Sequence, residues 1–243
     1  MSDHTDNYVN EQAEANGNEA FQVFIKFSIC GNLRFISHAE TIRVFQRAFA
    51  RSGINIAFSH GFNPRPKLSL PLPRSVGVEA CDELLCVWID SADANTKDEP
   101  NLKAEISAQL PDGLNIISVE ISKDKKSLQP VSAEYLFTIS RSGDIEKVDS
   151  LKQRIEYLIS AESLDVERCS DGKKKSRRID VRKFLESIEF NDNTESSEYC
   201  IIVRKKINSL GSIRVDEILT LLGLSQEDLA LPIIRSSIVW HEN

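Results

Sequence analysis

The sequence predicts an α+β fold made of two units of similar size. Three observations support this. Within about 100 residues the first half shows strand and helix patterns in the order β-α-β-β-α-β, which is the ferredoxin-like order. A polar segment at 123–130, containing Lys125, Lys126 and Pro130, is typical of a linker. The second half again mixes strands and helices, so we expect a second ferredoxin-like unit that is degenerate and has no clear sequence repeat.

The first unit is expected at residues 21–122, after a disordered acidic leader at residues 1–20 that contains no Lys or Arg. Alternating or short apolar segments predict strands at 21–29, 54–58, 83–90 and 114–121, a turn at Gly31-Asn32 and a short helix at 102–110. Leu68, Leu70 and Leu72 also alternate, but the prolines at 71 and 73 restrict that segment to a sheet edge or a bulge.

A helix after Ser37 is the best-defined element of this unit. Ser37 and Glu40 have the spacing of a capping box, and Gly53 is placed to end the helix. Ile42, Phe45 and Phe49 repeat with helical spacing and predict its buried side.

The second unit is expected at residues 131–243. Its pattern predicts strands at 134–140, 164–169, 199–207 and 233–240, helices at 145–160 and 215–222, and a short helix or strand at 181–188.

Composition limits the functional classes. No run of about 18 apolar residues predicts a membrane helix, and the start of the chain lacks a secretory signal, so we expect a cytoplasmic protein. The five cysteines are scattered and only Cys81 and Cys86 are close, so we expect neither a metal site nor a bound cofactor.

The net charge is −7, yet residues 21–79 carry eight basic residues against Glu40 and Glu79. This asymmetry favours an anionic partner for that segment.

Three arginines follow Ser37 at a spacing of four. Arg43, Arg47 and Arg51 form one row on the predicted helix, roughly opposite its apolar side. Arginine binds phosphate and carboxylate groups with two parallel hydrogen bonds. A binding surface and an ordinary solvated helix side are both compatible with this row.

The loop at 59–67 combines stiff, aromatic and basic residues. Its sequence is Ser59-His60-Gly61-Phe62-Asn63-Pro64-Arg65-Pro66-Lys67. Aromatic and basic side chains together hold single-stranded nucleic acid by stacking and charge. The alternative is a structural turn in which Phe62 fills the core.

His38 and His60 each follow a serine, and a histidine pair can act as general acid and base. Local packing of a histidine near a helix start is the alternative.

A secondary basic loop contains Lys173, Lys174, Lys175, Arg177 and Arg178, which favours either phosphate contact or a solvated hairpin tip. The residues 211–214, Gly-Ser-Ile-Arg before a helix, have the pattern of a weak anion nest.

These residues also carry a family resemblance. The motifs at 33–38, 59–67 and 76–79, with Arg43 and Arg47, resemble the radical SAM-linked bacterial domain family of unknown function. The resemblance extends over about residues 21–240, more loosely at 178–182 and 211–214. It implies a radical SAM enzyme as partner. The chain lacks the cysteine cluster of such an enzyme, and Glu40 takes the place of a family aspartate.

The sequence favours a binding role over catalysis. We expect an accessory protein of a radical SAM enzyme that binds RNA or a similar anionic substrate. Its expected phosphate contacts are Arg34, Arg43, Arg47, Arg65 and Lys67, with Phe62 for stacking and Ser37, His38, Ser59, His60, Gly61 and Asn63 around it. One alternative is a metal-independent ribonuclease that uses His38 and His60. The other is a protein-interaction module that docks the radical SAM partner.

Overall fold

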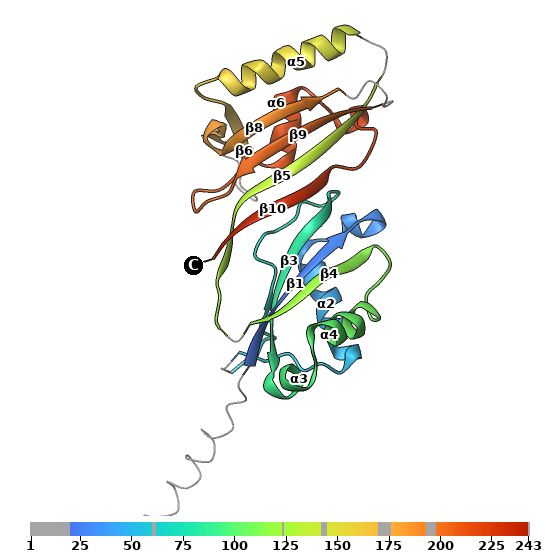
Figure 1. Cartoon of the computed structure of the whole chain (residues 1–243). Coiled ribbons are helices and arrows are strands. Elements are labelled where there is room, and N and C mark those ends of the chain that lie inside the picture. The colour runs from blue at the N-terminus through green and yellow to red at the C-terminus, as the bar shows by residue number, and fades with distance from the viewer. Residues whose placement is uncertain are drawn as a thin grey trace, which may run out of the picture.

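The computed structural model describes residues 20–59, 62–122, 124–141, 145–169, 176–192 and 198–242. The expected leader therefore lies almost entirely outside the described residues. Two sets of elements, one in each half of the chain, share a single eight-stranded sheet (Figure 1).

The first half has the ferredoxin-like topology. Its elements are β1 (Ala20–Ile29), α2 (His38–Ser52), β2 (Leu68–Ser69), β3 (Glu79–Asp90), α3 (Ser91–Thr96), α4 (Glu99–Ser107) and β4 (Leu114–Ser122). The strand order is β4-β1-β3, with β2 on the outer edge of β3, and all these pairs are antiparallel. Alternate residues of β1 pack against α2 and α4 in one core that includes Ile25, Phe45 and Ile106.

The second half repeats this topology. Its elements are β5 (Leu128–Ser140), α5 (Ile145–Ser160), β6 (Asp165–Cys169), β7 (Ser176–Asp180), β8 (Leu185–Asn191), β9 (Glu198–Lys206), α6 (Val215–Leu222) and β10 (Ile234–Glu242). The strand order is β10-β5-β9-β8, again antiparallel. The predicted α+β fold with two ferredoxin-like units is confirmed. The second unit departs from the simple pattern by the inserted hairpin β6–β7.

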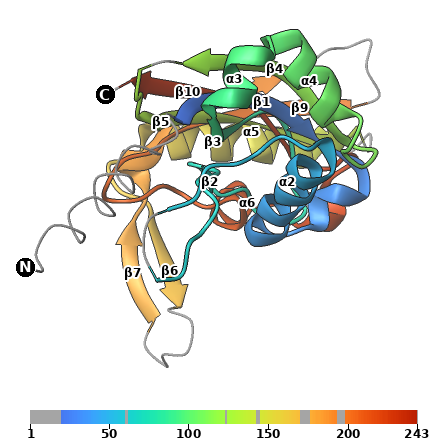
Figure 2. The same cartoon turned by 90° about the horizontal axis from the view of Figure 1, so that it is seen from below.

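The two halves join because β2 is short. It pairs only with Val87 and Cys86, near the end of β3. The beginning of the same β3 edge is left for β10, which pairs in parallel through Ile234↔Glu79 and Arg235↔Ala80. α2 and α6 lie on the same side of the resulting sheet, and the β6–β7 hairpin projects from that side too (Figure 2).

Several local predictions needed correction. The segment 54–58 is not a strand, because it makes only isolated bridges at Ile56 and Phe58. The alternating leucines form a strand only at Leu68–Ser69, since the prolines that follow cannot donate to the sheet. Gly31 opens a 3₁₀ helix (Gly31–Phe35) instead of a simple turn, and β5 already begins at Leu128, inside the expected linker.

Candidate anion-binding surface

The capping box at the start of α2 forms as predicted. The Glu40 backbone N–H donates to Ser37 Oγ at 3.3 Å, and Ser37 N–H donates back to Glu40 Oε2 at 2.8 Å. Hydrogen bonds from the Ser37 backbone and hydroxyl, with a smaller effect of Arg43, lower the pKa of Glu40. Gly53 ends the helix in the left-handed conformation with φ 72°. The buried side differs slightly from prediction, since Thr41 and Ala48 are buried while Ile42 is only partly so.

The arginine row divides into two parts. Arg51 donates to the backbone carbonyl of Gln109 and, through Nε, to its side-chain oxygen at 3.3 Å, so it ties α2 to the end of α4. Arg43 and Arg47 are exposed, and neither has a hydrogen bond or ion pair with any described residue. Arg43 does feel the nearby Glu40 carboxylate. Two guanidinium groups on one helix side are therefore open to an external anion.

The loop after α2 is held by its own backbone. Ser59 N–H donates to Arg65 O at 2.8 Å, Arg65 N–H donates to Ser59 Oγ at 3.0 Å, and Phe58 and Pro66 form a bridge. Phe62 is fully exposed at its tip, with 101% relative accessibility, so it does not fill the core. Asn63 and Arg65 are exposed and Lys67 is partly so, whereas His60 and Gly61 lie outside the described residues.

Arg34 is engaged within its own neighbourhood. Its Nη1 donates to Gly31 O at 2.8 Å and lies 3.9 Å from Glu79 Oε1, and the guanidinium covers the Phe35 ring at 4.3 Å. Glu79 also accepts from Gly31 N–H at 2.8 Å. These contacts make Arg34 a poorer phosphate ligand than Arg43 or Arg47, because a bound anion would compete with Glu79.

His38 is the first residue of α2 and is half-buried. It lines a cavity of about 10 Å³ together with Thr41, Arg74 and Glu83 among others. A space of this size is at the lower limit for one water molecule. His38 therefore faces a packed interior there. The predicted partner, His60, lies outside the described residues.

The buried charges beneath this cavity did not emerge from the sequence. Arg235 donates from Nε and Nη2 to Glu83 at 2.7 and 2.6 Å, and both residues are almost completely buried. Arg74 donates to the backbone carbonyls of Arg34, Ser75, Val78 and Ile36, among others. Burial raises the pKa of Glu83, although Arg235 opposes that effect. The sequence did contain one signal of this pair. Glu83 lies on the core-facing side of its strand, and a buried charge requires a partner.

The secondary basic loop is only partly described, because Lys173, Lys174 and Lys175 lie outside the described residues. Arg178 pairs with Asp165 across the hairpin, with Nε 3.3 Å from Oδ2, and Arg177 is exposed. At the start of α6, Glu217 accepts from Arg214 N–H at 2.7 Å and from Arg168 at 2.6 and 2.8 Å. The protein's own carboxylate thus occupies the position where the sequence suggested an anion nest.

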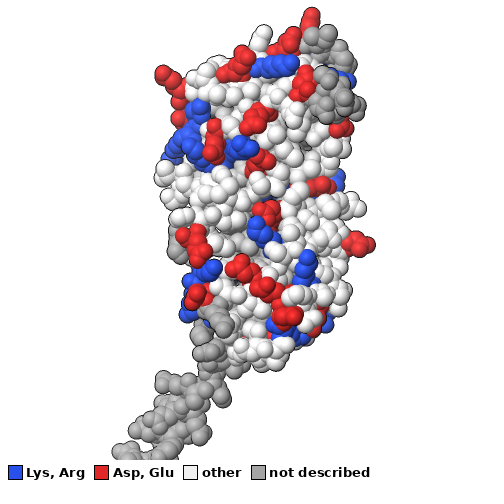
Figure 3. Space-filling view, viewed as in Figure 1, with Lys and Arg blue, Asp and Glu red and all other residues white. Residues whose placement is uncertain are grey.

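The exposed cations and Phe62 are carried by α2 and by the segment before β2, and both elements lie on the same side of the sheet as α6. Figure 2 shows α2 and the segment before β2 on that side. The face seen in Figure 3 instead carries positive and negative side chains interspersed. Elsewhere in the described chain, ion pairs such as Lys26–Asp82 and Arg204–Glu134 bring opposite charges together. No group of three or more His, Cys, Asp or Glu residues suited to a metal ion occurs within the described ranges.

No helix in the described part of the chain is long and apolar enough to cross a membrane. No curated protein sequence matches the chain. Among solved structures, the acetolactate synthase small subunit from Thermotoga maritima aligns with 10% identity and a TM-score of 0.25, covering 93% of this chain and 98% of that one. Residues 22–215, which span most of both units, match the family described as uncharacterized protein conserved in bacteria, DUF2344. The chain belongs to this bacterial family.

Proposed function

We propose that this protein binds single-stranded RNA, or a similar polyanion, through the surface formed by Arg43, Arg47, Phe62, Arg65 and Lys67. The supporting observation is the combination of a fully exposed Phe62 with four basic side chains that form no ion pair with any described residue. Each base of a single strand offers a ring face, and each linkage offers a phosphate, so this combination suits RNA without requiring a fixed sequence.

The proposed surface is smaller than the one expected from the sequence. Arg34 and Arg51 are left out because their guanidinium groups already have partners on this chain. A phosphate at either position would have to displace an existing hydrogen bond, which reduces the net gain.

We propose further that the bound RNA is a substrate of a radical SAM enzyme and that this protein presents it. This part rests on the resemblance noted from the sequence. Its test is co-purification from cells before and after nuclease treatment. A radical SAM enzyme that is retained only when RNA is intact supports presentation of RNA. Retention without RNA supports the rival function, a module that docks the enzyme directly.

The binding claim is tested by fluorescence anisotropy of a labelled single-stranded RNA. Phe62→Ala removes the stacking ring, and we expect an affinity loss of about tenfold, since a stacked base contributes about 1–3 kcal/mol. Arg47→Gln is compared with Arg51→Gln, which lies on the same helix row but donates to Gln109. Equal losses from these two arginine variants would contradict the proposal.

The ribonuclease alternative needs only one added observation. The same RNA is incubated with the protein in EDTA, and its length is followed on a gel. Cleavage that disappears in His38→Ala or His60→Ala would favour catalysis, whereas intact RNA leaves the binding function.

A further inference from the structure

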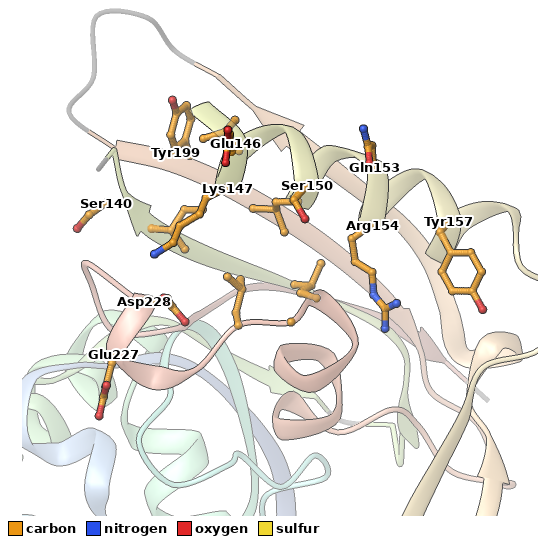
Figure 4. A pocket seen from close by; sticks show the side chains of 16 residues that line it. Ser140, Glu146, Lys147, Ser150, Gln153, Arg154, Tyr157, Tyr199, Glu227 and Asp228 are labelled. Atoms are coloured by element: carbon orange, nitrogen blue, oxygen red, sulfur yellow. The ribbon is translucent and has the colours of Figure 1, made fainter. Parts of the chain in front are cut away.

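A second cavity lies in the other half of the molecule, between α5 and α6. It has a volume of about 980 Å³. Residues of α5 between Glu146 and Tyr157 line one wall, and the last residue of α6 and those that follow it line the other (Figure 4). This size is typical of pockets that bind small organic molecules. None of the proposed RNA contacts lies in it.

The cavity results from a difference in helix length. α5 has 16 residues and α6 has only 8, which corresponds to about 24 Å against about 12 Å of helix. Gly223 then ends α6 in the left-handed conformation with φ 69°. The first half of α5 therefore has no neighbouring helix along its inner side, and the sheet residues Ile139 and Tyr199 form part of the cavity lining instead.

Apolar side chains line the inner part of the cavity, and Arg154 lies at one end. Leu151 and Leu222, both buried, contribute the apolar lining together with Ile139. Arg154 donates from Nε to Leu221 O at 2.7 Å, at the carboxyl end of α6. Figure 4 shows its guanidinium extending from α5 into the space between the helices. Across the ranges that the structure describes, Arg154 has no carboxylate within ion-pair distance.

The opposite end carries two carboxylates, from Glu227 and Asp228, and the ammonium group of Lys147. Asp228 accepts hydrogen bonds from the backbone and hydroxyl of Ser225, both at 2.8 Å, and these bonds lower the pKa of its carboxyl group. Lys147 lies close enough to contribute to the same effect. The two carboxylates outnumber the single ammonium group at this end, so a second negative charge on the ligand is disfavoured there. The cavity is therefore complementary to one negative charge beside an apolar body.

We propose that the cavity between α5 and α6 binds a small organic monoanion, with its acidic head group at Arg154 and its apolar body against Leu151 and Leu222. Arginine suits this role because its planar donors match a carboxylate with two parallel hydrogen bonds. The anchoring of Nε by Leu221 O fixes the direction of the guanidinium before the ligand arrives.

The test uses two fluorescent probes of nearly the same shape with the full chain. 1-Anilinonaphthalene-8-sulfonate carries one negative charge, and N-phenyl-1-naphthylamine is its neutral counterpart. We expect Arg154→Gln to weaken binding of the anionic probe about tenfold and to leave the neutral probe unchanged, because only the charged hydrogen bonds are lost. Ser150 lines the cavity and is exposed, so Ser150→Phe should fill part of the cavity and weaken binding of both probes.

Lys152→Gln is the matched control. Lys152 is on the same helix but outside the cavity, beside Asp192 with Nζ 3.8 Å from Oδ2. It should leave both probes unaffected. Decanoate should displace the anionic probe at a lower concentration than 1-decanol, and single-stranded RNA should not displace it. Displacement by RNA, equal loss in Arg154→Gln and Lys152→Gln, or no binding of the anionic probe at all would overturn the proposal. Because the RNA-binding variants lie in the other half, either proposal can fail alone.

Discussion

Replacing Arg235 by methionine should sharply destabilise the protein. Arg235 is 1% exposed and Glu83 is 4% exposed, and two hydrogen bonds of 2.7 and 2.6 Å connect them. The variant would leave the Glu83 carboxylate buried without its partner. Breaking a buried ion pair in this way costs about 3–5 kcal/mol. Since domains are stable by only about 5–15 kcal/mol, the effect should be easy to measure.

Equilibrium unfolding in urea, followed by tryptophan fluorescence, is a suitable assay for this variant. The only two tryptophans of the chain, Trp88 and Trp240, lie on β3 and β10 and pack against one small cluster at the junction. The double variant Glu83→Met/Arg235→Met should recover much of the loss, because neither charge then remains buried. Two results would refute this reasoning. One is a double variant whose loss of unfolding free energy equals the sum of the two single losses. The other is an Arg235→Met variant that loses no more stability than Arg204→Met, which breaks an exposed pair.

Two further predictions concern stability. Burial, assisted by Arg235, lowers the pKa of Lys205 from 10.5 to about 8, so the unfolded chain binds more protons between these values. The urea midpoint should therefore rise with pH across that interval relative to the midpoint of Lys205→Met, and a constant difference would contradict the assignment. Gly113→Ala should lower the free energy of unfolding more than Gly53→Ala does. Both glycines have positive φ, but only at Gly113 would the added Cβ lie 2.7 Å from the Cys30 carbonyl oxygen. Equal urea midpoints for the two alanine variants would contradict this explanation.

Local sequence signals predicted the elements that depend on local interactions. The capping box of Ser37 and Glu40 and the terminating Gly53 set the ends of α2 through contacts within four residues or a single backbone conformation. The helix at 145–160 was predicted with its observed bounds, because its apolar period is clear.

Features that depend on distant pairing were missed. The segment 54–58 has strand composition, but it shares the β3 edge with β2. It makes only two isolated bridges, Ile56 with Ile89 and Phe58 with Pro66. The charge of residues 21–79 suggested one basic surface, yet Arg74 is committed to backbone carbonyls and Arg51 to Gln109. A local pattern does not reveal which arginine will find an internal partner.

The cavity between α5 and α6 could have been anticipated in part. The predicted helices at 145–160 and 215–222 already differed twofold in length, and in a ferredoxin-like unit they cover the same side of the sheet. Recognising the cavity also required knowing that Arg154 contacts the end of α6, which depends on residues 67 positions apart.

The salt dependence of RNA binding tests the proposed function most directly. Four phosphate contacts, from Arg43, Arg47, Arg65 and Lys67, predict that the logarithm of the association constant falls with the logarithm of salt concentration with a slope of about −3 for single-stranded RNA. The double variant Arg43→Gln/Arg47→Gln should reduce that slope to about half, and Arg51→Gln should leave it unchanged. A slope near zero, or one that the double variant does not alter, would contradict the proposed surface.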